Sequence, residues 1–253
     1  MNELNEFKKF SRLLSDESGA IIRKYFRTHI GFESKSDESP VTIADKKSEE
    51  RMRELIMKEF PEHGIIGEEF GKHNPEAEYQ WVLDPIDGTK SFICGTVTFG
   101  TMIALTKKDE PIIGVVNQPI LNEFLIGDND TALLNDVKVK VRECENLSDA
   151  VLLTTDHKNI EKYQDKEKFD ELINRCKLYR NWGDCYGYYL VATGYADIML
   201  DPIMSVWDLM ALIPIIKGAG GVITDYTGSD PVKGNSIIAS NKILHPKVVS
   251  QLN

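Results

Sequence analysis

Residues 81–92 read WVLDPIDGTKSF, and this stretch organises the rest of the sequence. Three apolar residues lead directly into Asp84, as at the end of a buried strand. Pro85 fixes φ and donates no backbone hydrogen bond, so we expect the chain to turn there. We expect Asp84 and Asp87 to face one point, while Gly88 lets the backbone approach a ligand. The alternative is an acidic turn whose carboxylates only cap backbone amides.

The chemistry of this turn suits a metal ion and a phosphate together. Carboxylate oxygens are hard ligands, and Mg²⁺ binds few of them, sharing its other positions with water and substrate phosphate. Thr89 follows the glycine and can cap a helix that starts there. Helix N-termini attract anions. The stretch therefore offers cation ligands on one side and phosphate-binding amides on the other.

Further acids stand at predicted element ends beside apolar runs. Glu68 and Glu69 follow the strand-like GII, Asp45 stands at the start of a predicted helix, and Asp208 begins a strongly apolar one. For Asp45 and Asp208 the alternative is a first-turn acid that only interacts with the helix dipole. Because α/β proteins build their sites at strand and helix ends, we interpret the four acidic segments as one site.

Composition restricts the class of protein. The chain has 253 residues, of which 42% are hydrophobic and 28% charged, enough for one large domain or two lobes with a shared core. A formal net charge of −10 argues against a nucleic-acid partner and against an anionic membrane surface. An anionic ligand would need local positive charge, which metal ions supply. The histidines form no HxH or HxxxH pair, which argues against zinc.

Cysteine usage and the N-terminus indicate the compartment. The four cysteines form no CxxC pair, and the charged N-terminal residues do not resemble a secretory signal. No apolar run reaches the length of a membrane helix. We therefore expect free thiols and a cytoplasmic protein.

Hydrophobic periodicity predicts an α+β N-terminal lobe over residues 1–145 and an α/β C-terminal lobe over residues 146–253, which together form one compact unit. Alternating segments around a charged turn, TFGTMIALTKK and EPIIGVVNQP, predict a β-hairpin. Helices are expected over 3–28, 44–59, 166–177, 184–194 and 206–218. GFESKSDESP is expected to be a polar loop.

Taken in order, GEE, WVLDPIDGTKSF and SVWDLMALIPIIKGAGG resemble the signature segments of the inositol-monophosphatase superfamily. SPVTIAD and YLVATGYAD fit as well, so the resemblance runs from about residue 3 to the C-terminus. Members are Mg²⁺-dependent, lithium-sensitive phosphomonoesterases. The resemblance implies a layered α-β-α-β-α sandwich, commonly a homodimer, and a small-molecule phosphate ester as the substrate.

The same resemblance implies roles for individual residues. Asp45 and Thr89 would orient and deprotonate the attacking water, and the amides of Gly88 and Thr89 would cradle the phosphate. Two metals can clamp the attacking and leaving oxygens of an in-line displacement, so no histidine acid is required. The implied ligands of two or three Mg²⁺ ions are Glu68, Asp84, the Ile86 carbonyl, Asp87 and Asp208.

The segments WGDCYGY, DPIMSVWD and DGTKSF resemble the histidinol-phosphatase branch, and with it histidine biosynthesis. Histidinol phosphate carries an ammonium and an imidazole, which Asp184 or Asp201 could pair with. Arg180 could contact phosphate or brace the loop, and Trp182 or Tyr186 could lie against the imidazole.

Structural alternatives remain for these substrate-side residues: a helix cap for Asp184, a salt bridge for Arg180 and a core position for Trp182. Lys35 matches a lysine of a mobile loop in the family, or is a solvated loop residue. The rival functions are another phosphatase of the superfamily, acting for example on inositol phosphate, and a non-catalytic metal-stabilised binding protein.

Overall fold

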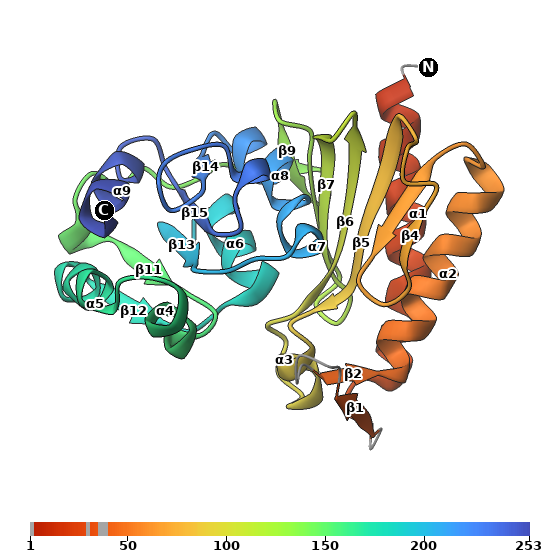
Figure 1. Cartoon of the computed structure of the whole chain (residues 1–253), viewed down its shortest axis with the longest axis horizontal. Helices are drawn as coiled ribbons and strands as arrows, with labels where there is room; N and C mark the ends of the chain where they lie inside the picture. Colours follow the sequence, from red (N-terminus) through yellow and green to blue (C-terminus); the bar gives the residue numbers. More distant parts are fainter. Residues whose placement is uncertain (1–2, 29–30, 35–39) are drawn as a thin grey trace.

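The computed structural model describes residues 3–28, 31–34 and 40–253. Helical and sheet layers alternate across the molecule (Figure 1). From the N-terminal side, a helix pair covers a larger sheet, further helices separate that sheet from a smaller one, and a last set of helices covers the smaller sheet. The layered α-β-α-β-α sandwich expected from the resemblance is therefore confirmed.

The larger sheet runs in the order β10-β9-β8-β7-β6-β5-β3-β4. β5 lies parallel to β3 and antiparallel to β6. The predicted hairpin is β6–β7, joined by Lys108 and Asp109, whose positive φ values of 51° and 67° suit a tight turn. The strands are β3 (Gly64–Gly67), β4 (Gly71–His73), β5 (Tyr79–Asp87), β6 (Gly100–Lys107), β7 (Glu110–Gln118), β8 (Glu123–Gly127), β9 (Ala132–Leu134) and β10 (Val137–Lys138).

Helices α1 (Glu3–Tyr25) and α2 (Ile43–Glu59) cover the outer face of the larger sheet. Phe7, Phe10 and Leu14 recur at helical spacing on α1 and are buried against it, as the sequence pattern predicts. A short antiparallel pair, β1 (Phe32–Ser34) and β2 (Pro40–Thr42), precedes α2 within the segment expected to be a polar loop.

The smaller sheet runs in the order β12-β11-β13-β15-β14. Helices α6, α7 and α8 lie between the two sheets; α6 and α8 pack on both, and α7 packs on β5 and β6 of the larger one. The elements are β11 (Val151–Leu153), β12 (Leu178–Arg180), β13 (Ile198–Asp201), β14 (Val222–Thr224), β15 (Ile237–Ser240), α6 (Asp184–Ala192), α7 (Val206–Leu209) and α8 (Leu212–Gly218), with the 3₁₀ turns η1 (Leu147–Asp149) and η2 (Pro231–Lys233).

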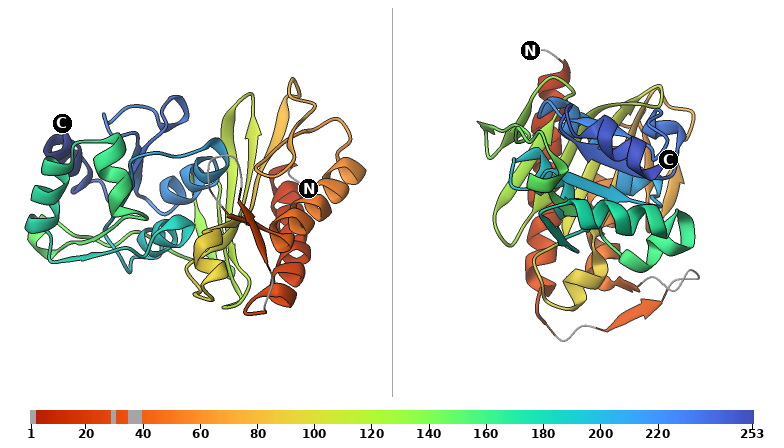
Figure 2. Two further views of the ribbon diagram at one scale, coloured as in Figure 1. Left: turned by 60° about the horizontal axis from the view of Figure 1, so that its bottom comes forward. Right: turned by 90° about the vertical axis from the view of Figure 1, so that its left-hand side faces the viewer.

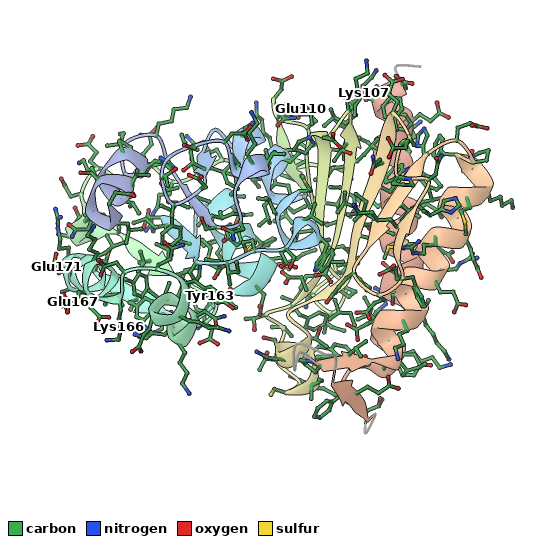
Figure 3. The ribbon with its side chains drawn as sticks, in the orientation of Figure 1. Lys107, Glu110, Tyr163, Lys166, Glu167 and Glu171 are labelled. Atoms are coloured by element: carbon green, nitrogen blue, oxygen red, sulfur yellow. The ribbon has the colours of Figure 1, made fainter. Side chains whose placement is uncertain are left out.

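Helices α4 (His157–Tyr163), α5 (Lys166–Arg175) and α9 (His245–Leu252) cover the outer face of the smaller sheet, as the right-hand view of Figure 2 shows. On α5, Phe169 and Leu172 are buried, whereas Glu167 and Glu171 point outwards (Figure 3). This amphipathic division explains why a helix with so many charges still docks on the sheet.

The structure corrects two expectations about elements. The chain does not turn at Pro85: β5 continues to Asp87, with an irregular register against β6 after Asp84. The apolar helix expected over 206–218 is divided into α7 and α8. Pro214 stands in the first turn of α8, where its missing N–H costs no hydrogen bond. No helix of the described part is long and apolar enough to cross a membrane.

Candidate active site

The C-terminal end of β5 places two of the predicted ligands together. Its register against β6 is irregular between Asp84 and Asp87, and there the Thr101 hydroxyl donates to the Pro85 carbonyl at 2.9 Å. In a regular strand, side chains three residues apart point to opposite faces. Here one carboxylate oxygen from each of Asp84, Asp87 and Asp208 lies within 4.8 Å of the others. The irregular stretch thus converts a strand end into a cluster of acids.

Asp208 reaches this cluster from α7, the short helix that packs against β5. The Ser205 amide donates to Asp208 Oδ2 at 2.9 Å in a capping box. One carboxylate therefore satisfies the helix N-terminus and faces the two acids of β5. Asp208 therefore also interacts with the N-terminus of its helix, as the alternative interpretation expected. This interaction holds its side chain in place.

Glu68 enters the same pocket from the loop after β3. Its amide donates to the Leu83 carbonyl at 3.1 Å, which extends the parallel pairing of β3 and β5 by one residue. Glu68 lines the pocket together with Asp208. Parallel strands bring their carboxyl ends to the same edge of a sheet, which is why two separate acidic segments meet here.

Glu49 supports that loop from α2, a role that sequence reasoning missed. Its carboxylate is fully buried and accepts from the amides of Glu69 at 2.7 Å and Phe70 at 3.1 Å. The Arg53 guanidinium donates to it at 2.8 Å. A Cβ on Gly67 would lie 1.9 Å from Glu49 Oε1, so only glycine fits there. The helical spacing of Glu49 from the predicted catalytic acid of α2 was the available signal.

The clustered acids raise one another's pKa values. Burial, followed by the charges of Glu68, Asp87 and Asp208, raises the pKa of Asp84 well above its usual range. Burial, followed by Asp184 and Asp208, does the same for Asp87. For Asp208, burial is again the largest cause and the pKa rises to about 6. Like charges in a dry environment disfavour ionisation, and a bound cation would reverse this.

The cluster fits a hard divalent cation. Asp84 is 2% exposed, yet its Oδ1 has no hydrogen-bond partner among the described residues. A buried, unpaired carboxylate oxygen is costly, and a bound cation is one of the few groups that compensate for it. Every donor atom in the cluster is oxygen, the ligand type of Mg²⁺ and Ca²⁺ rather than of zinc.

Asp45 and Thr89 meet next to this cluster. Asp45 is fully buried at the start of α2, where its Oδ2 accepts from the Thr42 amide at 2.9 Å and hydroxyl at 2.6 Å. Burial raises the pKa of Asp45 to about 6. The Thr89 hydroxyl lies 3.4 Å from Asp45 Oδ1 and 3.0 Å from the Ile86 carbonyl. The structure therefore brings the predicted pair together and places the Ile86 carbonyl against it.

Gly88 occupies the N-cap of the short helix α3 (Thr89–Ile93). Thr89 is the first residue of the helix, whereas we had expected it to be the cap. The φ of Gly88 is 89°. A Cβ there would lie 2.9 Å from Asp184 Oδ2 and 3.0 Å from the Thr98 carbonyl. Backbone conformation and crowding both require glycine at this position.

Asp184 lies against the loop after β5. It is the first residue of α6, has a left-handed φ of 51°, and its amide donates to the Thr155 hydroxyl at 2.8 Å. The Ser91 hydroxyl lies 3.4 Å from its Oδ2. The next amide, that of Cys185, donates to the Asp87 carboxylate. Asp184 thus faces the turn at Gly88 and the side chain of Ser91, and burial raises its pKa to about 6.

Asp201 braces the pocket from behind. It is 4% exposed, and its Oδ1 accepts from the Thr155 amide at 3.0 Å. Its Oδ2 accepts from the Thr155 hydroxyl at 3.0 Å and from the Tyr188 hydroxyl at 2.9 Å. Because both oxygens of the carboxylate accept these bonds, the position of Asp201 favours a support for the loop after β11 over the expected pairing with a substrate ammonium.

The other predicted substrate residues point elsewhere. The Arg180 side chain is exposed and donates to the Tyr179 carbonyl at 2.7 Å, and Arg180 is not among the described residues that line the pocket. Tyr186 stacks on Tyr189, with ring centroids 5.0 Å apart, against the core between the sheets. Trp182 is 46% exposed and so is not a core residue, but it does not line the pocket either.

The site opens into a pocket of about 400 Å³ that is lined by residues from both halves of the sequence. The loops after β11 and β12 supply one wall. Sequence reasoning pointed to the loop before Asp184 but missed the loop after β11, although TTD follows an apolar strand just as the other acidic segments do. The described residues lining it are Pro40, Glu68, Gly88, Thr89, Lys90, Ser91, Thr155, Asp156, Asn159, Asn181, Gly183, Asp184 and Asp208.

Histidines and cysteines do not line this pocket in the described part of the chain. His63 accepts from the Trp81 indole N–H at 3.1 Å, and His245 contacts the Thr224 hydroxyl at 3.1 Å, so both are structural. All four cysteines are free, as predicted. Lys35, which the resemblance suggested near the site, lies outside the described residues.

Comparison with known proteins agrees with this geometry. The model of the inositol monophosphatase family matches residues 3–253. The chain is 44% identical over 229 residues to the Arabidopsis thaliana protein named bifunctional phosphatase IMPL2, chloroplastic, covering 89% of this chain and 66% of that protein.

Two further matches extend over nearly whole chains. Identity to the Chlorobaculum parvum protein named histidinol-phosphatase is 36% over 242 residues, covering 94% of this chain and 93% of that one. The solved structure of an inositol monophosphatase from Zymomonas mobilis superposes with a TM-score of 0.89 at 34% identity, covering 100% and 99% of the two chains. The chain belongs to the inositol monophosphatase family of phosphatases.

Proposed function

We propose that this protein is a Mg²⁺-dependent phosphomonoesterase whose preferred substrate is L-histidinol phosphate. The observation that carries the proposal is the meeting of two groups in one pocket. The carboxylates of Asp84, Asp87 and Asp208, with an unpaired buried oxygen on Asp84, lie beside the hydrogen-bonded pair of Asp45 and Thr89. This combination supports hydrolysis by an activated water.

In the proposed mechanism, Glu68, Asp84, the Ile86 carbonyl, Asp87 and Asp208 hold two or three Mg²⁺ ions. When bound, these ions lower the pKa of a coordinated water and stabilise charge on phosphate and leaving oxygens. The chain itself holds the ligands in position. The irregular end of β5 positions Asp84 and Asp87, and the Ser205 capping box positions Asp208. The hydrogen bond from the Glu69 amide to Glu49 holds the loop that carries Glu68.

The proton of the attacking water passes to the pair of Thr89 and Asp45. The Thr89 hydroxyl accepts a hydrogen bond from water while it donates to Asp45 Oδ1, which lies 3.4 Å away. With a pKa of about 6, Asp45 is mostly ionised at neutral pH and able to take a proton. The amides of Gly88 and Thr89 would cradle the phosphate oxygens.

Two observations support a cationic ester over a neutral polyol phosphate. The pocket wall is rich in acids and includes a carboxylate, Asp156, outside the metal cluster. In addition, the Chlorobaculum parvum relative that matches over nearly its whole length is named histidinol-phosphatase. Inositol phosphate is the second candidate, because the Zymomonas mobilis structure with 34% identity is an inositol monophosphatase.

The compartment and assembly state belong to the same proposal. Four free cysteines support a reducing compartment, which we take to be the cytoplasm. A homodimer is expected from the resemblance to the superfamily. Size-exclusion chromatography with light scattering measures the mass in solution. A dimer would have twice the mass of the single chain, and the mass of a single chain would contradict the homodimer.

Phosphate release from L-histidinol phosphate and from inositol 1-phosphate, each with Mg²⁺ and with EDTA, tests the function. We expect release that requires Mg²⁺ and is faster from histidinol phosphate. Preference for inositol phosphate would preserve the metal mechanism and contradict the substrate. Release from neither ester, in protein shown to be folded, would favour the non-catalytic binding protein.

A further inference from the structure

The pocket has two chemically different walls. One contains Glu68, Thr89 and Asp208, from the larger sheet and α7, and holds the predicted metal and phosphate groups. The other consists of the loop between β11 and α4 and the loop between β12 and α6, which lie across from α3 in Figure 1. An ester with its phosphate at the first wall has the second wall beside it in the same pocket.

The second wall is held firmly in place. Asp201 binds the amide and hydroxyl of Thr155 from behind, and the Thr155 hydroxyl accepts from the Asp184 amide at 2.8 Å. The Asn181 side-chain NH₂ lies 3.5 Å from the Thr155 carbonyl and 3.2 Å from the Tyr179 hydroxyl. The two loops are therefore joined to each other and to the sheet, as a preorganised binding surface requires.

Three side chains on this wall have capacity to bind a ligand. Asp156 Oδ1 accepts from the Lys158 amide at 2.9 Å, and no hydrogen bond to its Oδ2 is found within the described chain. Asn159 is partly buried, lines the pocket and an adjoining cavity of about 100 Å³, and its side-chain amide makes no hydrogen bond within the described ranges. In Asn181 the bonded atom is the amide nitrogen, which leaves the carbonyl oxygen to accept.

The charge on this wall separates it from the metal cluster. Asp156 is not part of the close group of Asp84, Asp87 and Asp208, which a bound metal would neutralise. Lys90, the basic residue among the described lining residues, comes from α3 on the opposite wall. Asp156 is therefore an acid of this wall that metals bound at the cluster would not neutralise.

We propose that Asp156, together with the side-chain amides of Asn159 and Asn181, forms a leaving-group subsite that selects a positively charged alcohol bearing N–H donors. This subsite rests on the proposed function. Asp156 pairs with the ammonium or a protonated ring, and the two amide oxygens accept from the remaining N–H groups.

Asp156→Asn tests the subsite without removing its structural role. Asp156 is the N-cap of α4, and asparagine caps as well as aspartate. We expect the ratio of kcat/KM for histidinol phosphate to that for inositol 1-phosphate to fall about tenfold, mainly through KM for the cationic ester. Asn159→Ala should lower the same ratio by a smaller factor.

Asp165→Asn is the matched control. Asp165 is the N-cap of α5, its side chain accepts from the Lys168 amide at 3.1 Å, and it does not line the pocket. This variant should keep the wild-type ratio. An unchanged ratio in Asp156→Asn, while wild type hydrolyses histidinol phosphate, would overturn the subsite and leave the proposed function standing.

A wild-type protein that does not hydrolyse histidinol phosphate would show that the proposed substrate is wrong, which is separate from failure of the subsite. If wild type releases no phosphate from histidinol phosphate, the subsite is tested with ethanolamine phosphate against glycerol 1-phosphate. A wild-type preference for the cationic ester that is lost in Asp156→Asn would support the subsite. Absence of any such preference in wild type would overturn it.

Discussion

Asp84 and Asp201 are buried aspartates at strand ends in the two sheets, and their surroundings differ completely. Asp84 Oδ1 has no hydrogen-bond partner among the described residues, and the charged groups that raise the pKa of Asp84 are acids. Both oxygens of Asp201 accept hydrogen bonds, from Thr155 and Tyr188. An acid at a strand end can thus be a ligand or a brace, and the partners of its oxygens distinguish the two.

The largest effect should come from removing the ligand. Asp84→Asn should lower phosphate release by roughly 10³-fold or more, because several kcal/mol of transition-state charge stabilisation depend on the metal. In EDTA the same variant should melt at a higher temperature than wild type, since it removes a charge from the acid cluster. Enzyme assays and calorimetric melting measure the two effects, and a variant that melts lower in EDTA would contradict the repulsion.

Next in size is the effect at the water-activating pair. Thr89→Ala should reduce kcat by about 10²-fold, because Asp45 then loses the hydroxyl that links it to the water. Thr89→Ser keeps the hydroxyl and is the matched control, expected to retain most of the rate. Equal rates in the two variants would remove Thr89 from the mechanism.

Removing the brace should act on stability. Asp201→Ala leaves the Thr155 amide and the buried Tyr188 hydroxyl without their partner. We expect the free energy of unfolding to fall by about 3 kcal/mol, which lowers Tm by roughly 6–12 °C in a chain of this size. A Tm equal to that of wild type would show that Asp201 is not a brace, and would return it to the candidates for substrate binding.

The smallest predicted effect is a pH dependence of the metal-free protein. The pKa of Asp208 is raised from 3.8 to about 6 and that of Asp201 from 3.8 to about 7. A folded-state pKa above the unfolded value gives stability that is complete below pH 4 and is lost as pH rises towards 7. We expect Tm in EDTA to fall as pH rises across this window, and a rise would contradict the assignment.

The sequence predicted the local features of the site well. Acids beside apolar runs identified Glu68, Asp84, Asp87 and Asp208. The structure clusters the three aspartates, and Glu68 lines the pocket together with Asp208. Periodicity also predicted α2 and the β6–β7 hairpin, because each depends on contacts between residues close in the sequence. The resemblance to a family supplied the layered fold, which no single segment encodes.

Long-range packing accounts for what could not be predicted. Asp201 receives its hydrogen bonds from Thr155, 46 residues away, and Tyr188, 13 residues away. The local sequence DPIMSVWD does not predict these hydrogen-bond partners. The wall containing Asp156 and Asn159 was missed for the same reason, since only the packing of the loops after β11 and β12 places it opposite the acids.

The dependence of phosphate release on free Mg²⁺, measured with L-histidinol phosphate for wild type, Asp84→Asn and Asp201→Asn, tests the account most directly. We predict saturable activation by Mg²⁺ in wild type and Asp201→Asn, no release in EDTA, and almost no activation of Asp84→Asn at any concentration. Release that persists in EDTA, or normal activation of Asp84→Asn, would contradict a metal centre built on the unpaired carboxylate of β5.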